Sequence, residues 1–350
     1  MRNRHLGQDV AQIQTGCGRR TVSIARFLIC PALALACLSP ARADPLLADF
    51  DYPHPVQRYQ FESQGQSLSM AYMDVRPAQP SGKTVVLLHG KNFCGATWEG
   101  TIGPLRDAGY RVVVPDQIGF CKSSKPQAYQ FALHQLAGNT HALLASVGAD
   151  RPIVVGHSMG GMLAMRYALM YPRDLAGLVL VNPIGLEDWK AKGVPLVTVD
   201  QLYERELKTS FDSIKKYQLT TYYAGEWKPQ YDRWVQMLAG MYAGEGAKLV
   251  AWNQALTSDM ILSQPVIHEI DQIAVPTVLM IGQRDTTAIG KDRAPPDLAK
   301  ELGNYPDLGR KAHERIKGSV LVPFPDLGHS PQVQDPLAFN KAFLEQLARM

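Results

Sequence analysis

The stretch Ile153-Val154-Val155-Gly156-His157-Ser158-Met159-Gly160 joins a buried-strand pattern to a helical pattern through a turn that carries a serine. Its β-branched residues predict a strand covered on both faces, and residues 160–170 have the apolar spacing of a helix. A Cβ two residues before or after Ser158 would clash in so tight a turn, which explains the glycines there. The pattern predicts a strained serine whose hydroxyl stands above the strand end, beside the first N–H groups of a helix.

Two later segments offer the base and the acid that a nucleophilic serine needs. Asp285 ends the segment Gly282-Gln283-Arg284-Asp285 just after a predicted strand, and His329 follows the last predicted strand. Both positions are loops at the carboxyl ends of strands, where the active sites of open α/β sheets form. We therefore predict that Ser158, His329 and Asp285 act as nucleophile, general base and orienting acid.

Other side chains compete for the role of the acid. Asn182 follows the preceding predicted strand but cannot be anionic, while Asp271 and Asp292 are less well placed relative to the strands. An ordinary surface aspartate at position 285 and a capping histidine at position 329 are the structural alternatives. The sequence by itself leaves both of these alternatives open.

The segment Leu88-His89-Gly90-Lys91 ends an earlier predicted strand and is the candidate oxyanion loop. The backbone N–H groups of Lys91 and Met159 are the predicted oxyanion donors, and loss of one such donor typically lowers the rate by ~10²–10³-fold. His89 and His157 are interpreted as packed, structural histidines. The Lys91 side chain either places a cation at the mouth of the site or points to water, and we favour the second.

The remaining sequence alternates strand and helix patterns, which predicts an α/β fold with a mostly parallel sheet. Residues 57–62 and 67–74 alternate polar and apolar side chains around Gln64-Gly65 and predict a leading antiparallel hairpin. Short apolar runs predict buried parallel strands over residues 84–88, 111–114, 153–155, 178–181, 277–281 and 319–322.

Residues 183–272 break this alternation, because they contain no convincing buried strand and have mostly helical patterns. A segment of this length inside a compact domain is predicted to be an inserted helical unit, because long structureless loops are uncommon there. It holds four of the five tryptophans, Trp189, Trp227, Trp234 and Trp252. These aromatic side chains either form the core of the insert or line a pocket for an apolar substrate.

Taken together, these motifs resemble those of the α/β-hydrolase fold family of the serine-triad type with a helical cap. The resemblance covers residues 57–349 and rests on His89-Gly90 and on residues 115–120, 156–161, 282–285 and 328–329. It implies a mostly parallel twisted sheet flanked by helices. The core would comprise residues 44–182 and 273–350, and the inserted helical cap residues 183–272.

The family resemblance also implies a chemistry. Its members hydrolyse esters, lactones, thioesters or amides through an acyl-enzyme, with no cofactor and no metal, and their cap selects the substrate. The chain is similar to the epoxide hydrolase and haloalkane dehalogenase branch as well, but these enzymes use an aspartate nucleophile, and this chain has Ser158. Enzymes that cleave carbon–carbon bonds or form peracids share the same triad and stay open as alternatives.

Two cysteines are predicted to form a disulfide. Cys94 and Cys121 are the only cysteines after residue 43. In the family fold, the loops that bear them leave neighbouring strands on the same side of the sheet. An even pair in an exported protein favours a disulfide, and two unpaired buried thiols are the alternative.

Residues 1–43 resemble an export signal. A basic region ending at Arg26 precedes the apolar residues 27–38, and Ala41-Arg42-Ala43 has the small-x-small pattern of a signal peptidase site. The apolar run is too short to span a bilayer of ~30 Å as a helix. We predict cleavage after Ala43, a periplasmic or secreted location and no integral membrane span after cleavage. An uncleaved anchor and a lipid-modified Cys37 stay open.

The net charge of +4 belongs to this leader, which holds six arginines and one aspartate. The remaining chain has 30 basic and 31 acidic residues, which argues against a nucleic-acid partner. The sequence therefore predicts an exported serine hydrolase that cleaves a small or medium neutral ester, lactone or thioester. A non-catalytic ligand receptor is a remote alternative, and the sequence does not indicate an oligomeric state.

Overall fold

The chain begins its sheet with an antiparallel hairpin. The computed structural model describes residues 45–350, so the predicted leader lies outside the described residues. Strands β1 (Val56–Ser63) and β2 (Gln66–Val75) pair in antiparallel fashion. They are joined by Gln64 and Gly65, both at positive φ, the geometry that a tight two-residue hairpin turn requires. The predicted hairpin is therefore present.

The other six strands form the parallel part of one eight-stranded sheet, in the order β1-β2-β4-β3-β5-β6-β7-β8. Only the β1–β2 and β2–β4 pairs are antiparallel. These six strands are β3 (Thr84–Leu88), β4 (Arg111–Pro115), β5 (Ile153–His157), β6 (Gly177–Val181), β7 (Thr277–Gly282) and β8 (Val320–Phe324). The predicted α/β fold with a mostly parallel sheet is confirmed.

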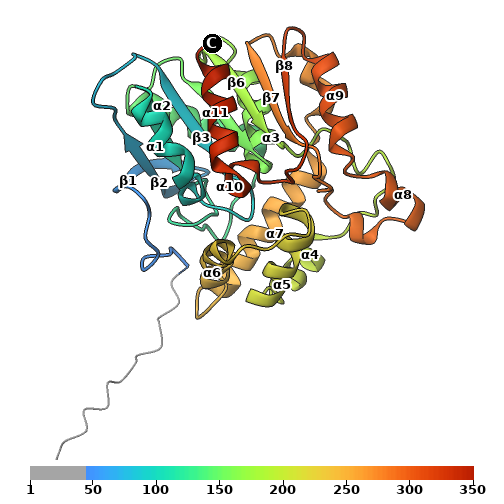
Figure 1. Ribbon diagram of the computed structural model, residues 1–350. Helices are drawn as coiled ribbons and strands as arrows, with labels where there is room; N and C mark the ends of the chain where they lie inside the picture. Colours follow the sequence, from blue (N-terminus) through green and yellow to red (C-terminus); the bar gives the residue numbers. More distant parts are fainter. Residues whose placement is uncertain (1–44) are drawn as a thin grey trace, which may run out of the picture. The chain divides into compact units, whose positions relative to one another are not determined.

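Helices cover both faces of the sheet (Figure 1). In β3, Val86 and Leu88 point into the core shared with one helical layer, while Val85 and Leu87 point into the core on the other face. This alternation explains why the strand is apolar at every position from Val85 to Leu88. The first layer contains α2 (Leu133–Ser146), α3 (Met159–Met170) and α9 (Tyr305–Arg315), and the second contains α1 (Glu99–Asp107) and α11 (Pro336–Leu347).

Short helical segments also lie in the chain after β3, β7 and β8. They are η1 (Gly95–Trp98), η5 (Lys291–Arg293), α8 (Pro296–Glu301) and α10 (Pro331–Gln334). The last of these lies directly after the loop that carries His329. Loops that follow the parallel strands therefore hold the residues that the sequence analysis selected.

The interval between β6 and β7 is helical, as predicted. Figure 1 shows its helices gathered at one end of the sheet. They are α4 (Val199–Glu206), α5 (Phe211–Tyr217), α6 (Asp232–Met241) and α7 (Ala247–Ser263), with the π-turn η2 (Gln218–Tyr222) and the 3-10 turns η3 (Pro229–Tyr231) and η4 (Ile267–Gln272). Side-chain capping boxes begin two of them, Thr198 with Gln201 for α4 and Ser210 with Ser213 for α5. Residues 183–272 are called the cap below, and its boundaries stay a prediction.

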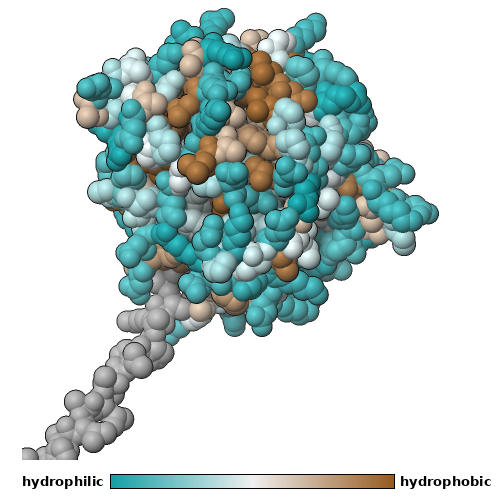
Figure 2. All heavy atoms as spheres, viewed as in Figure 1, coloured by the Kyte–Doolittle hydropathy of each residue, from teal (hydrophilic) through white to brown (hydrophobic). Residues whose placement is uncertain are grey.

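The face of the molecule drawn in Figure 2 is mostly hydrophilic. Hydrophobic side chains gather in the region where Figure 1 shows β7 and β8 beside α11. β8 is an edge strand of the sheet, and Val320 at its start is exposed. Across residues 45–350, none of the helices combines the length and apolar character that crossing a membrane would need.

Candidate active site

Ser158 lies on the sharp turn between β5 and α3. Its backbone has φ 56° and ψ −120°, a region that non-glycine residues rarely occupy and that costs of the order of 1–3 kcal/mol. The residue is buried but lines a cavity. Met159 begins α3 directly after it, so the first N–H groups of that helix point toward the serine and favour negative charge there.

The two glycines of the turn are required by crowding. A Cβ on Gly156 would lie 2.1 Å from the carbonyl oxygen of Gly160, and a Cβ on Gly160 would lie 2.4 Å from the oxygen of Leu88. Both partners are backbone atoms that cannot move aside. Glycine at both positions therefore permits the sharp turn that carries Ser158 at the end of β5.

Asp285 and His329 lie side by side although they come from different loops. Asp285 follows β7 and His329 follows β8, and the neighbouring parallel strands bring the two loops together. Nδ1 of His329 lies 2.7 Å from Oδ2 of Asp285, and both side chains are buried. Among the described residues, Nε2 of His329 has no hydrogen-bond partner. With Nδ1 donating to the carboxylate, Nε2 is the nitrogen left to accept a proton.

The acid is held by a residue whose role the sequence analysis missed. Asn182 follows β6, and its Nδ2 donates to Oδ2 of Asp285 at 2.8 Å. Its Oδ1 accepts from the N–H of Gly282 at 2.9 Å, and the backbone N–H of Thr287 donates to Oδ1 of Asp285 at 2.8 Å. The place of Asn182 at the end of a strand beside that of the acid was the available signal. From the sequence, Asn182 is a candidate only for the acid itself, a role that its neutral amide excludes.

The two aspartates that were weighed as alternatives lie elsewhere. Asp292 forms ion pairs with Arg205 and Arg293, and Asp271 forms one with Arg315 at 3.0 Å. Both carboxylates are more than half exposed. The structure therefore pairs His329 with Asp285.

The candidate oxyanion loop contacts the serine. A Cβ on Gly90 would lie 2.9 Å from Cβ of Ser158, so only glycine lets the loop approach this closely. The next residue is Lys91, whose backbone N–H follows directly in the loop. Together with the N–H of Met159 at the start of α3, it forms the predicted donor pair.

His89 and His157 both lie in packed, structural positions. Nε2 of His89 accepts from the N–H of Gln117 at 3.0 Å, and its Nδ1 lies 2.8 Å from the carbonyl of Gly90. Nε2 of His157 lies 2.8 Å from the backbone carbonyl of His329. Burial lowers the pKa of both His89 and His157, so both are neutral braces, one for the oxyanion loop and one for the histidine loop.

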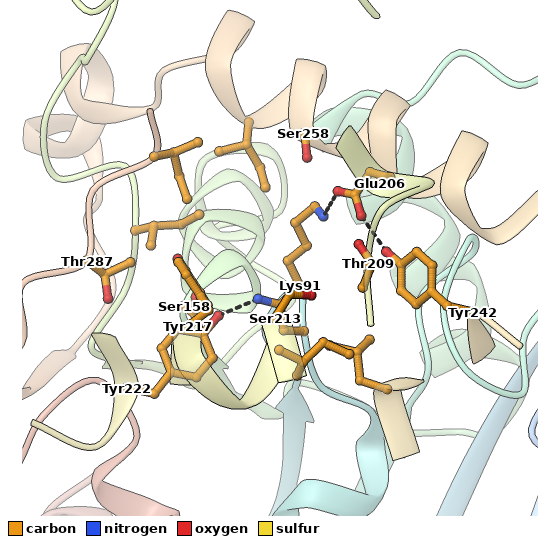
Figure 3. Close-up of a pocket in the computed structure, with 16 residues that line it drawn as sticks. Lys91, Ser158, Glu206, Thr209, Ser213, Tyr217, Tyr222, Tyr242, Ser258 and Thr287 are labelled. Atoms are coloured by element: carbon orange, nitrogen blue, oxygen red, sulfur yellow. Dashed lines mark hydrogen bonds and ion pairs between the residues drawn. The ribbon is translucent and has the colours of Figure 1, made fainter. Parts of the chain in front are cut away.

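A cavity of about 290 Å³ opens over Ser158 between the cap and the core. One part of its wall is aliphatic, and another carries hydroxyl groups (Figure 3). The aliphatic residues are Ile184, Ile214, Leu238, Ile261 and Ile289, and the aromatic residues are Tyr217, Tyr222 and Tyr242. Of the described residues, no tryptophan lines it. The expectation that the cap aromatics form the pocket thus holds for tyrosines, whereas the tryptophans pack elsewhere.

The Lys91 side chain does not point to water, which corrects the interpretation that we favoured. Its Nζ lies 2.8 Å from Oε1 of Glu206 at the end of α4. The hydroxyl of Tyr242 donates to Oε2 of the same carboxylate at 2.5 Å, and Figure 3 shows the three side chains in line. The signal was missed because Glu206 lies 115 residues away. The cation at the site is thereby paired with a cap carboxylate.

The structure joins Cys94 and Cys121 by a disulfide, with the sulfur atoms 1.97 Å and the Cα atoms 5.8 Å apart. The bond ties the oxyanion loop to the loop after β4. Asp116 lies beside these sulfurs. Its Oδ1 accepts from the N–H of Gly95, and its Oδ2 accepts from the hydroxyl of Tyr52 and the N–H of Lys122. The Asp116 carboxylate thus already has hydrogen-bond donors from the protein.

Replacing both cysteines with serine is expected to lower the free energy of unfolding by roughly 3–4 kcal/mol, because the bond closes a loop in the unfolded chain. Urea unfolding of the double variant Cys94→Ser/Cys121→Ser against the wild type measures this difference. Reductant should destabilise the wild type and leave the double variant unchanged. Two thiols that react with an alkylating reagent in the natively purified protein would contradict the prediction.

Comparison with known proteins places this geometry in a family. A family model described as "alpha/beta hydrolase fold" matches residues 83–305. A 2-hydroxy-6-oxo-6-phenylhexa-2,4-dienoate hydrolase from Burkholderia cepacia is 27% identical, and the match covers 76% of this chain and 88% of that protein. Lipase 1 from Psychrobacter immobilis is 28% identical, with 75% of this chain and 77% of the lipase covered.

A solved structure is similar over almost its full length. It is described as a "probable hydrolytic enzyme" from Pseudomonas aeruginosa PAO1 and is 60% identical to this chain. The match covers 87% of this chain and 97% of that structure, with a TM-score of 0.86. The model match over more than half of the chain, the sheet order and the strained serine turn agree, and the chain belongs to the α/β-hydrolase fold family.

Proposed function

We propose that the protein is an exported serine hydrolase that cleaves a small or medium neutral ester, lactone or thioester through an acyl-enzyme. The observation that carries this proposal is the buried Asp285–His329 pair, which lies in the loops after β7 and β8, at the same edge of the parallel sheet as Ser158 after β5. Export is proposed from the leader pattern of residues 1–43. The molecule belongs to a family of hydrolases, and the residues at this site supply a nucleophile, a base and an acid.

The first half of the reaction forms the acyl-enzyme. Ser158 Oγ attacks the carbonyl carbon of the substrate while Nε2 of His329 takes the hydroxyl proton, and Asp285 stabilises the resulting imidazolium. The N–H groups of Lys91 and Met159 donate to the oxyanion. The intermediate then expels the alcohol or thiol, which receives the proton from His329. A water molecule repeats these steps on the acyl-enzyme and releases the acid.

The cavity supports a compact, neutral substrate. Its volume of about 290 Å³ is at the small end for ligand sites. Its aliphatic wall suits an apolar acyl group. Lys91 and Glu206 neutralise each other at 2.8 Å, so the site offers hydrogen-bond donors and acceptors without net charge.

We expect kcat/KM for short alkyl or aryl esters to exceed that for long-chain lipids and peptides by at least tenfold, which corresponds to ~1.4 kcal/mol of transition-state preference. A panel of purified short esters, lactones, long-chain lipids and peptides, tested on the mature protein, measures this ratio. The physical reason is that a small covered cavity excludes long chains from Ser158. A tenfold preference for peptides or insoluble lipids would overturn the small-pocket interpretation.

The variant Glu206→Gln serves as the control for charge. It leaves the Lys91 cation unpaired in the cavity, so the preference should move toward esters that carry a carboxylate. The ratio of kcat/KM for an acidic half-ester to that for its neutral methyl ester should therefore rise. An unchanged ratio would mean that substrates do not reach this end of the cavity.

A second candidate is a carbon–carbon bond hydrolase on the same residues. It is favoured by the 27% identity to the dienoate hydrolase over most of that protein. The lipase similarity of 28% favours the ester reaction instead. Turnover of a vinylogous diketone in the same panel, at a kcat/KM above that of every ester, would select carbon–carbon cleavage. Peracid formation from a carboxylic acid and peroxide is the remaining alternative on this triad.

A further inference from the structure

Tyr222 of the cap lies directly against the proposed catalytic base. Its ring stacks on the His329 imidazole with centroids 4.7 Å apart and planes 29° apart. Its carbonyl oxygen accepts the backbone N–H of His329 at 2.9 Å. A Cβ on the preceding Gly328 would lie 2.7 Å from this same oxygen, so the glycine of the Gly328-His329 pair is what lets the cap backbone approach.

The hydroxyl of Tyr222 reaches the other half of the site. It accepts from Nδ2 of Asn92 at 2.8 Å, and Figure 3 shows this hydrogen bond near Ser158. Asn92 is the residue after Lys91 in the candidate oxyanion loop. Burial raises the pKa of the Tyr222 phenol well above its ordinary value, so the hydroxyl stays neutral and keeps this geometry.

The local backbone explains how one residue makes both contacts. Tyr222 ends the π-turn η2, in which the N–H of Tyr223 bonds to the carbonyl of Gln218 at 3.0 Å, five residues back. Single π-turns of this kind often occur at functional sites. The wider turn leaves the Tyr222 carbonyl to face the histidine loop while the ring covers the imidazole.

We propose that Tyr222 is a positioning residue through which the cap aligns the catalytic histidine and the oxyanion loop at the same time. The inference rests on the proposed function, because it assigns a role relative to the triad. The ring limits rotation of the His329 imidazole, so that Nε2 faces the serine. The hydroxyl holds Asn92 and, with it, the backbone N–H of Lys91. The cap therefore completes the reactive geometry as well as enclosing the substrate.

The chain offers graded variants and a matched control. Tyr222→Phe removes only the hydroxyl, and Tyr222→Leu also removes the stacked ring, while the backbone bond to His329 stays. Tyr223→Phe is the control, because this neighbouring tyrosine is buried and its hydroxyl has no partner among the described residues. Asn92→Ala removes the other partner of the hydroxyl bond.

We expect Tyr222→Phe to lower kcat about tenfold and Tyr222→Leu about 100-fold, both with KM nearly unchanged. Tyr223→Phe should stay within twofold of the wild type. Asn92→Ala should match Tyr222→Phe, and the double variant should be no slower than either single one, because both remove one shared bond. The unfolding midpoint of each variant is measured as well, to check that it folds. If Tyr222→Leu does not fold, the Tyr222→Phe and Asn92→Ala variants test the proposal.

Several outcomes would overturn the proposal. A wild-type kcat in Tyr222→Phe would show that the Tyr222 hydroxyl does not position the oxyanion loop. A raised KM with unchanged kcat in Tyr222→Leu would make Tyr222 a substrate contact. Additive losses in the double variant would show that Asn92 and Tyr222 act separately. A wild-type protein that turns over no ester, thioester, lactone or diketone would instead refute the proposed function. The activity of the wild type is therefore measured first, before the variants are tested.

Discussion

Replacing Ser158 with alanine is expected to lower kcat by about five to six orders of magnitude, because the members of a catalytic triad act as one unit. The fold should persist, since the serine hydroxyl lies at the cavity and the turn is shaped by Gly156 and Gly160. Steady-state turnover of a short chromogenic ester measures the loss. A fluorophosphonate should label the wild type at Ser158 and leave Ser158→Ala unlabelled.

The control for this experiment is another serine of the same cavity. Ser258 of α7 lines the wall but lies outside the triad. Ser258→Ala should keep its activity within a few-fold and should still be labelled at Ser158. Peptide mapping that finds the fluorophosphonate on any other residue would refute the nucleophile, as would a Ser158→Ala variant with more than a tenth of the wild-type rate.

Replacing Asp285 with asparagine is expected to lower kcat by about 10⁴. Three donors surround the carboxylate, namely Nδ1 of His329, Nδ2 of Asn182 and the N–H of Thr287. An asparagine side chain must turn its own NH₂ group toward at least one of them. It also lacks the negative charge that stabilises the imidazolium in the transition state. Pre-steady-state acylation with a chromogenic ester measures the loss at the step in which His329 takes the proton.

The same substitution at the surface provides the comparison. Asp292 is more than half exposed and pairs with Arg205 and Arg293. Asp292→Asn should leave kcat within twofold, because exposed ion pairs contribute little. A large loss of kcat in Asp292→Asn together with a small loss in Asp285→Asn would show that the assignment of Asp285 as the acid is wrong. The competing aspartates would then be reconsidered.

The cap takes part in the site at two neighbouring positions of the oxyanion loop. Lys91 is paired with Glu206 of α4, and Asn92 donates to Tyr222 of η2. Both cap residues line the cavity. A change in how the cap packs would therefore alter the loop that is proposed to bind the oxyanion. Selectivity and rate are expected to respond together to cap substitutions.

Short-range patterns in the sequence were sufficient for the fold and for the choice of Ser158, Asp285 and His329 as candidates. A strand buried on both faces is mostly apolar, and β5 and β6 are buried at every residue, with His157 at the end of β5 as their one polar side chain. The turn around Ser158 needs glycines two residues away on each side, because backbone atoms occupy the space of any Cβ. Such constraints act within a few residues, so a single segment displays them.

Only the tertiary structure revealed Asn182 beside the acid, Glu206 beside Lys91 and Tyr222 beside Asn92. The partners in these pairs are 103, 115 and 130 residues apart. No periodicity or turn rule links residues at such separations. The first contact depends on β6 and β7 lying side by side in the sheet, and the other two depend on how the cap packs over the strand ends. An amide, a carboxylate or a phenol has the same local preferences whether it meets solvent or the active site, and packing alone decides which of the two it meets.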